Sequence, residues 1–139
     1  MNILKVLTPR RIVGNFGERA AAKHLKKNGY KILKMNYTAV DNEIDIIAEN
    51  RAYTVFIEVK TRSENYDKTK EPRPACAVTE KKQRGIIDAA RYYIARNKNE
   101  KRIRFDIIEV IVDSASKSKV LELKHLENAF NYNTAYGRK

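Results

Sequence analysis

Apolar and polar residues alternate with a period of two in five segments of this chain. Such alternation places apolar side chains on one face of a β-strand and polar side chains on the other. The first four segments are rich in Ile, Val, Tyr and Phe, which favour strands. The pattern therefore predicts strands at 30–38, 43–49, 54–61, 102–112 and 119–126, of which the last is the weakest.

Two further segments have apolar residues at the helical spacing of three and four positions. The first predicts a helix from Asn15, as its N-cap, to Asn28, with Gly29 as the residue that ends it. The second predicts a longer helix that Thr79 caps and that ends at about Asn97.

This order of elements predicts an α/β fold, a mixed β-sheet flanked by helices. The first three strands form an antiparallel meander, and the helix that follows them permits a parallel neighbour. The 139 residues are expected to form one domain. Within it we expect a flexible arm at 1–13, a mobile loop at 63–76 and a tail of uncertain structure at 127–139.

The composition is strongly basic, with 29 Lys and Arg residues against 17 Asp and Glu and a net charge of +12. A charge of this size favours polyanionic partners, of which nucleic acid, and DNA above all, is the first candidate. A solvated surface that only keeps the protein soluble is the alternative interpretation.

The sequence does not favour a disulfide-bonded, zinc-binding, membrane-spanning or secreted protein. Cys76 is the single cysteine, which excludes an internal disulfide and a thiolate metal cluster. His24 and His125 are far apart in sequence and do not predict a zinc site. No run of about 18 apolar residues predicts a membrane span, and 1–14 lacks a signal-peptide pattern. We expect a cytoplasmic protein with no membrane partner.

The second and third strands are joined by a turn, and its length decides which side chains meet. With a four-residue turn at 50–53, Asp45 lies directly opposite Glu58, and Glu43 lies opposite Lys60. Opposite residues have Cβ atoms about 4.5–5.5 Å apart. Any even turn keeps these side chains on one face, so two carboxylates and a lysine are predicted to converge.

Two neighbouring acids repel each other unless a cation lies between them. Oxygen ligands suit Mg²⁺ or Mn²⁺, and Lys60 could then stabilise an attacking hydroxide in phosphodiester hydrolysis. The alternative is a salt-bridged, solvated face. The E-x-K pattern alone does not decide, because it also occurs at 80–82 and 122–124.

Glu18 has two interpretations as well. With Asn15 it fits a capping box, which would explain it without any function. It also lies on the apolar stripe of its helix, where a carboxylate needs a metal or a lysine as partner.

Five blocks of the sequence, in this order, resemble the bacterial YraN-like family of predicted endonucleases. That family is similar to archaeal Holliday junction resolvases and belongs to the PD-(D/E)XK, restriction-endonuclease-like fold. The resemblance extends from about Gly14 to Val110. The blocks are GNFGERAAAKHLKKNGYKILKMNY, EIDIIAE, VFIEVKTRS, AVTEKKQRGIIDAARYYI and RFDIIEV.

The resemblance implies a role for several residues by position. Asp45 matches the first metal-binding acid of the family, Glu58 the second acid and Lys60 the lysine. Glu18 matches the helix acid of resolvase-like members, and Lys82 matches a basic position of the family. The resemblance further implies that the backbone carbonyl of Val59 is a metal ligand.

This chain also departs from the family pattern at particular positions. Asn42 stands where the family usually has glycine, and Ile44 stands where the proline before the aspartate would be. The loop before the second long helix lacks the glycine that the family commonly has there.

The leading hypothesis is a Mg²⁺- or Mn²⁺-dependent endonuclease that hydrolyses DNA, branched or damaged DNA included. Its resolvase-like relatives act as dimers, which implies a homodimer. A nucleic-acid-binding protein without catalysis and a basic scaffold protein are the two alternatives. The residues expected to contact phosphates are Arg62, Lys81, Lys82 and Arg84.

Overall fold

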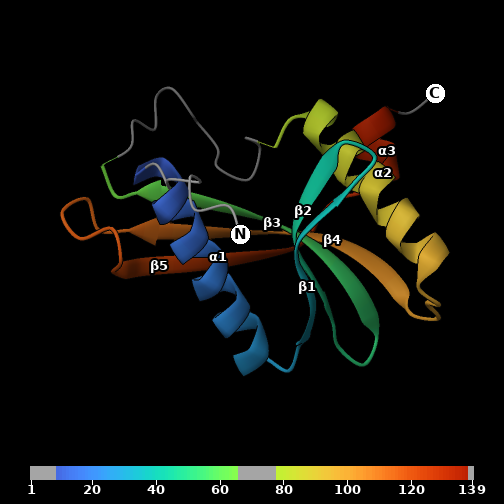
Figure 1. Ribbon diagram of the computed structural model, residues 1–139, viewed down its shortest axis with the longest axis horizontal. Helices are drawn as coiled ribbons and strands as arrows, with labels where there is room; N and C mark the ends of the chain where they lie inside the picture. The colour runs from blue at the N-terminus through green and yellow to red at the C-terminus, as the bar shows by residue number, and fades with distance from the viewer. Residues whose placement is uncertain (1–8, 66–77, 138–139) are drawn as a thin grey trace, which may run out of the picture.

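The protein is built around one five-stranded sheet with helices on both faces (Figure 1), as the computed structural model of residues 9–65 and 78–137 shows. The prediction of an α/β fold is confirmed. The elements in chain order are α1 (Pro9–Lys27), β1 (Lys31–Ala39), β2 (Asn42–Glu49), β3 (Tyr53–Ser63), α2 (Glu80–Arg96), β4 (Arg102–Val112), β5 (Val120–Phe130) and α3 (Tyr132–Tyr136).

The strands lie in the order β1-β2-β3-β4-β5. Strands β1, β2 and β3 pair antiparallel as a meander, and β4 pairs antiparallel with β5. Strand β4 pairs parallel with β3. Helix α2 connects the two strands and returns the chain to the edge of the sheet where β3 begins, so both strands run in the same direction. The prediction of a mixed sheet is confirmed.

Each face of the sheet carries its own apolar core. On one face, Leu25 of α1 packs into a cluster that includes Val55 and Ile57 of β3. On the other face, Phe56 packs into a cluster that includes Ile86 of α2. Figure 1 shows α1 apart from the pair α2 and α3. The alternation along β3 therefore sends its side chains toward different helices, and the candidate site lies near the middle of this strand, where its pairing with β2 stops.

Helix α1 begins earlier than predicted. It starts at Pro9, so the expected arm is helical from that residue on, while 1–8 lie outside the described residues. Proline is tolerated at the first helical position, because its missing N–H would be unpaired there in any case. Asn15 lies inside the helix and is not its N-cap, which was a wrong prediction. The predicted end is confirmed, since Gly29 follows with φ +88°.

The later elements agree with the predictions more closely. Thr79 caps α2, and its hydroxyl accepts a hydrogen bond from the Lys82 backbone N–H. Strand β5 continues to Phe130, beyond the predicted end, and the rest of the described tail forms α3 with Asn131 as its cap.

Most of the predicted loop falls on 66–77, outside the described residues. No helix within the described ranges is long and apolar enough to cross a membrane.

Candidate functional site

Strands β2 and β3 separate beside the two predicted metal-binding acids. The ladder runs from Glu49↔Thr54 to Ile46↔Ile57, in the predicted register, and goes no further. Asp45, the next residue, does not continue the ladder; its Oδ2 accepts a hydrogen bond from the Val59 backbone N–H at 2.8 Å. Asp45 and Glu58 are both buried, at 9% and 7% exposure.

The two carboxyl groups change each other's protonation. Burial, then the charge of Glu58, raises the pKa of Asp45 to about 7, although the Val59 N–H lowers it. Burial also raises the pKa of Glu58, against the opposing charges of Lys82 and Lys60. A hydrogen bond between the two carboxyls raises the pKa of Asp45 and lowers that of Glu58. The predicted convergence of an acid pair is therefore present. The two acids do not face each other across a regular ladder but meet where β2 and β3 separate, and this place is called the fork below.

Glu18 reaches the same place from α1. Its Oε1 accepts a hydrogen bond from the Asn36 Nδ2 at 2.8 Å. Burial raises its pKa, and the charges of Asp45 and Glu43 raise it further. The capping-box interpretation is wrong, because Asn15 lies inside the helix. Glu18 instead faces the acid pair.

A close approach of α1 to β3 holds Glu18 there. Gly17 is buried, and a Cβ at this position would lie only 1.9 Å from the Thr61 Oγ1. Only a residue without a side chain permits this separation. The glycine therefore lets the helix rest directly on β3, one residue before Glu18.

Two lysines border the acids from different elements. Lys60 is half-buried on β3, and Lys82 is exposed in the first turn of α2. The charges of both act on Glu58, where they lower its pKa. The structure thus brings Glu18, Asp45, Glu58 and Lys60 together, and adds Lys82 at the rim.

The other predicted phosphate-binding residues differ in their surroundings. Lys81 is exposed on α2. Arg84 is half-buried, and its Nη1 donates a hydrogen bond to the Ala135 carbonyl of α3 at 2.9 Å. Arg62 is largely buried on β3, where its Nε lies 3.5 Å from the Glu109 Oε2. Of this set, only Lys81 and Lys82 are exposed.

Glu109 is a carboxylate that the sequence analysis did not single out. It is 3% exposed on β4 and lies in parallel register with Lys60. Its distance from Arg62 corresponds to an ion pair rather than a hydrogen bond. The signal available in the sequence was its position two residues after Ile107, which gives it the same face as the core residue.

The carboxylate oxygens of Asp45 and Glu58 at the fork are ligands that suit a hard divalent cation. Glu58 Oε1 is buried and has no hydrogen-bond partner among residues 9–65 and 78–137. Mg²⁺ takes one or two carboxylates and completes its shell with water and phosphate oxygens. In the described parts of the chain, no three His, Cys, Asp or Glu residues lie close enough to enclose an ion by themselves. Two carboxylates with an unpaired buried oxygen fit a Mg²⁺ or Mn²⁺ ion that takes its remaining ligands from water and phosphate oxygens.

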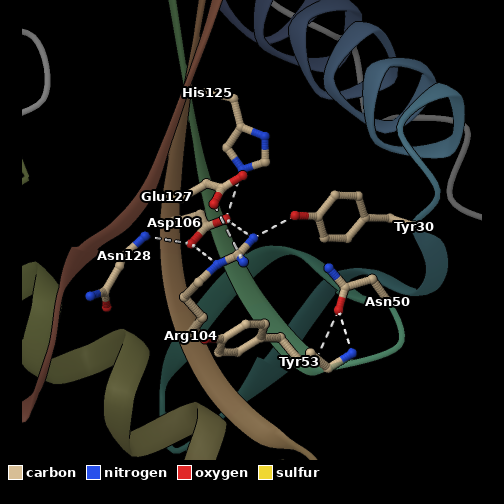
Figure 2. Close-up of polar contacts among 9 residues, drawn as sticks. Tyr30, Asn50, Tyr53, Arg104, Asp106, His125, Glu127 and Asn128 are labelled. Atoms are coloured by element: carbon tan, nitrogen blue, oxygen red, sulfur yellow. Dashed lines mark hydrogen bonds and ion pairs between the residues drawn. The ribbon is translucent and has the colours of Figure 1, made fainter.

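A second buried polar cluster lies on the α1 face, as Figure 2 shows. Arg104 donates through Nε and Nη2 to both carboxylate oxygens of Asp106, at 2.9 and 2.8 Å. Asp106 also bonds the His125 Nε2 at 2.7 Å and accepts from the Asn128 N–H at 2.9 Å. Arg104 Nη2 further donates to the Tyr30 hydroxyl at 2.5 Å. This cluster joins β4, β5 and the residue before β1.

The two histidines are neighbours, although they are far apart in sequence. The rings of His24 and His125 meet edge to face with centroids 5.5 Å apart. The Nε2 of His125 is already bonded to Asp106. Burial, then the charge of His125, lowers the pKa of His24. The sequence alone could not show this contact, because it depends on the pairing of β5 with β4.

The fold and the site together define a mixed α/β-sheet protein with a buried acid pair at a strand fork. Residues 17–110 match the family described as Uncharacterised protein family UPF0102. Because this match covers more than half of the chain, the protein belongs to that family.

Similar proteins come from several bacteria. A UPF0102 protein of Clostridium acetobutylicum is 43% identical over 119 residues, which are 84% of this chain and 92% of that protein. A UPF0102 protein of Caldanaerobacter subterraneus is 42% identical over 123 residues, 87% of this chain and 96% of that one. An XisH family protein from Nostoc punctiforme shares 14% identity and a TM-score of 0.38, over 78% of this chain and 98% of its own. That structural likeness adds nothing to the topology described above.

Proposed function

We propose that this protein is a metal-dependent endonuclease that hydrolyses phosphodiester bonds of DNA, with branched or damaged DNA as substrate. The observation that carries the proposal is the fork, where Asp45 and Glu58 converge with an unpaired buried oxygen. In this proposal the protein works in the cytoplasm as a homodimer, because two cuts across a branched DNA need two sites.

Each residue at the fork has a role in the proposal. Asp45 and Glu58, with the Val59 carbonyl, would hold Mg²⁺ or Mn²⁺. When bound, the ion supplies charge neutralisation of the phosphate and a lowered pKa of its water. The Lys60 ammonium would orient and stabilise the attacking hydroxide. Glu18, which Asn36 holds in place, would orient a water molecule at the same site.

The first turn of α2 would hold the DNA backbone. Lys81 and Lys82 are exposed there, and the N-terminus of a helix favours anions. Because Lys82 also acts on Glu58, a phosphate beside Lys82 would lie near the acid pair. Binding through such contacts weakens as salt rises.

A specific observation favours a second candidate function, DNA binding without cleavage. A basic protein with an acid pair that keeps a proton near neutral pH could bind DNA and not cut it. The two functions differ in their need for metal.

A cleavage panel separates the two candidates. Single strands, duplexes, flaps and four-way junctions are incubated with Mg²⁺, with Mn²⁺ or with EDTA. We expect metal-dependent cleavage that Asp45→Ala and Lys60→Ala each lower by about 10² or more, the range for removal of a charge-stabilising group. The matched controls are Glu122→Ala and Lys124→Ala, which alter an exposed E-x-K pair on β5. Cleavage that survives both fork substitutions would overturn the proposal, and equal DNA binding with and without metal but no cleavage favours the second candidate.

A further inference from the structure

A cleft of about 440 Å³ lies between α1 and the start of β5. Three of its lining residues are the cations Arg19, Lys23 and Lys27, all exposed on α1. None of the described residues that line it is acidic. The cleft is therefore a positively charged surface, on the side of the sheet that α1 covers (Figure 1).

The three cations form one row along the helix. They stand four residues apart, so they lie on the same face with a rise of about 6 Å from one to the next. Like charges at this spacing repel each other and destabilise a helix. A row of cations with this internal repulsion favours a bound chain of negative charges.

The floor of the cleft has a different character. It is formed by Phe16 of α1 together with Val120 and Leu123 of β5, all half-buried. Apolar and aromatic surface beside a row of cations is the combination that single-stranded nucleic acid requires, because its bases stack on side chains while its phosphates meet the charges. In a duplex the bases are paired inside the helix, so they do not stack on such an apolar surface.

The row also has a defined direction relative to the fork. Arg19 directly follows Glu18, and Lys23 and Lys27 lie successively farther along α1. Arg19 and Lys23 further line a second cleft of about 390 Å³, together with Lys26 of α1 and Met35 of β1. The cationic row therefore begins one residue after Glu18, which faces the acid pair, and continues toward the C-terminal end of α1.

We propose that the cleft binds a single-stranded DNA segment that leaves the fork along α1. Arg19, Lys23 and Lys27 contact its phosphates, and one base lies on Phe16 and Leu123. This inference rests on the proposed nuclease function for its substrate, a branched DNA with a single-stranded arm, but the binding itself needs no cleavage.

Fluorescence anisotropy with labelled oligo(dT) tests the cationic row. Titrations are made in EDTA over a range of salt concentrations, with the full chain. For Arg19→Ala/Lys23→Ala/Lys27→Ala we expect at least a tenfold loss of affinity, and a salt slope smaller by about 2, since each phosphate contact on a single strand contributes about 0.7. The matched control is Arg51→Ala/Lys98→Ala/Arg102→Ala, which removes three exposed cations outside the cleft. Equal affinity of the two triple variants overturns the proposal.

An oligonucleotide without bases tests the floor. We expect the abasic strand to bind the wild type several-fold more weakly than oligo(dT), and this difference to shrink in Phe16→Leu, which keeps an apolar side chain. An abasic strand that binds as well as oligo(dT) overturns the proposal, and so does a duplex competitor that displaces oligo(dT) as efficiently as a single strand. If the cleft binds oligo(dT) as proposed but the cleavage panel shows no activity, only the nuclease function fails; if cleavage occurs while the cleft variant binds normally, only this inference fails.

Discussion

The Oδ2 of Asp45 accepts a hydrogen bond from the Val59 backbone N–H at 2.8 Å, where the ladder between β2 and β3 has ended. A side-chain oxygen thus takes the place of a backbone carbonyl as the acceptor for β3. The bond fixes the carboxyl group of Asp45 beside Glu58, and the charge of Glu58 raises the pKa of Asp45. The position of the acid pair is therefore a consequence of strand separation as much as of strand register.

This arrangement predicts that the metal-free protein loses stability as pH rises. The pKa of Asp45 is about 7 in the folded protein and about 3.9 in an unfolded chain. Between these values the folded state binds more protons, so the free energy of unfolding falls with rising pH. Asp45→Asn is expected to raise that free energy above pH 7, on the order of a few kcal/mol, and to bring little gain near pH 4.

Urea denaturation in EDTA across this pH range measures the effect. Asp41→Asn, in the exposed turn before β2, is the control, because asparagine adopts its positive φ readily. A wild-type stability that stays flat between pH 5 and 8 would contradict the raised pKa of Asp45.

The contact between Asn42 and Gly85 predicts a second effect on stability. A Cβ at Gly85, inside α2, would lie 2.2 Å from the Asn42 Oδ1 and 2.8 Å from its Cγ. Gly85→Ala is therefore expected to destabilise the protein by about 1–3 kcal/mol through overpacking. In Asn42→Gly/Gly85→Ala the clash is gone, and alanine in a helix stabilises by up to about 1 kcal/mol relative to glycine.

Thermal denaturation of both single variants and the double variant completes this cycle. Asn42→Gly alone is the control, because the Asn42 side chain also donates to the Val40 carbonyl at 2.6 Å. A Gly85→Ala protein as stable as the wild type would mean that Asn42 moves aside at no cost.

Strong local patterns made much of the fold predictable. Strand β4 has the predicted bounds, because its alternation and β-branched residues are unambiguous. The register of β2 with β3 followed from the length of a turn. By contrast, Asn15 and Glu18 together have the pattern of a helix N-terminus. The neighbouring residues do not indicate that the helix already begins at Pro9 and continues through Asn15.

The remainder depends on contacts between distant segments. The short helix α3 is held by the Tyr136 hydroxyl, which donates to Asp88, and by the bond from Arg84 to Ala135. The partnership of Arg62 with Glu109 likewise requires the parallel pairing of β3 and β4. The sequence could indicate the four residues of the fork, since they lie on predicted strands and a predicted helix, but not these pairings.

The buried cluster around Asp106 predicts a loss of stability in acid. Burial alone would raise the pKa of Asp106, but hydrogen bonds from His125 and Arg104 outweigh it and hold the pKa below its ordinary value. A depressed pKa contributes stability above the unfolded value of about 3.9, and this contribution is lost as pH falls below it. Asp106→Asn is expected to remove it and to cost about 3–5 kcal/mol at neutral pH, because the buried Arg104 loses its charged partner.

The matched control is Glu127→Gln. Glu127 also pairs with Arg104, at 3.6 Å, but its side chain is 60% exposed, so a change within about 1 kcal/mol is expected. Acid titrations followed by circular dichroism compare the two variants with the wild type. The same acid midpoint for wild type and Asp106→Asn, with equal stability at neutral pH, would rule out the assigned role of Asp106.

The contrast between Arg62 and Lys82 gives the last prediction. The Arg62 side chain is 9% exposed and lies 3.5 Å from a Glu109 that is 4% exposed. Arg62→Ala leaves that carboxylate buried without its partner, which is expected to cost about 3–5 kcal/mol of stability. Lys82→Ala removes an exposed charge that acts on Glu58 and should alter stability by no more than about 1 kcal/mol.

DNA affinity is expected to change in the opposite order. Lys82 is exposed at the rim of the fork, so its removal should weaken binding to duplex DNA several-fold and lower the salt slope by about 1. Folded Arg62→Ala protein should bind nearly as the wild type does, because its guanidinium is engaged inside the sheet. Urea denaturation and anisotropy titrations on the same samples measure both quantities. An Arg62→Ala protein with wild-type stability and lost affinity would instead place that guanidinium on the DNA, as its sequence position suggests.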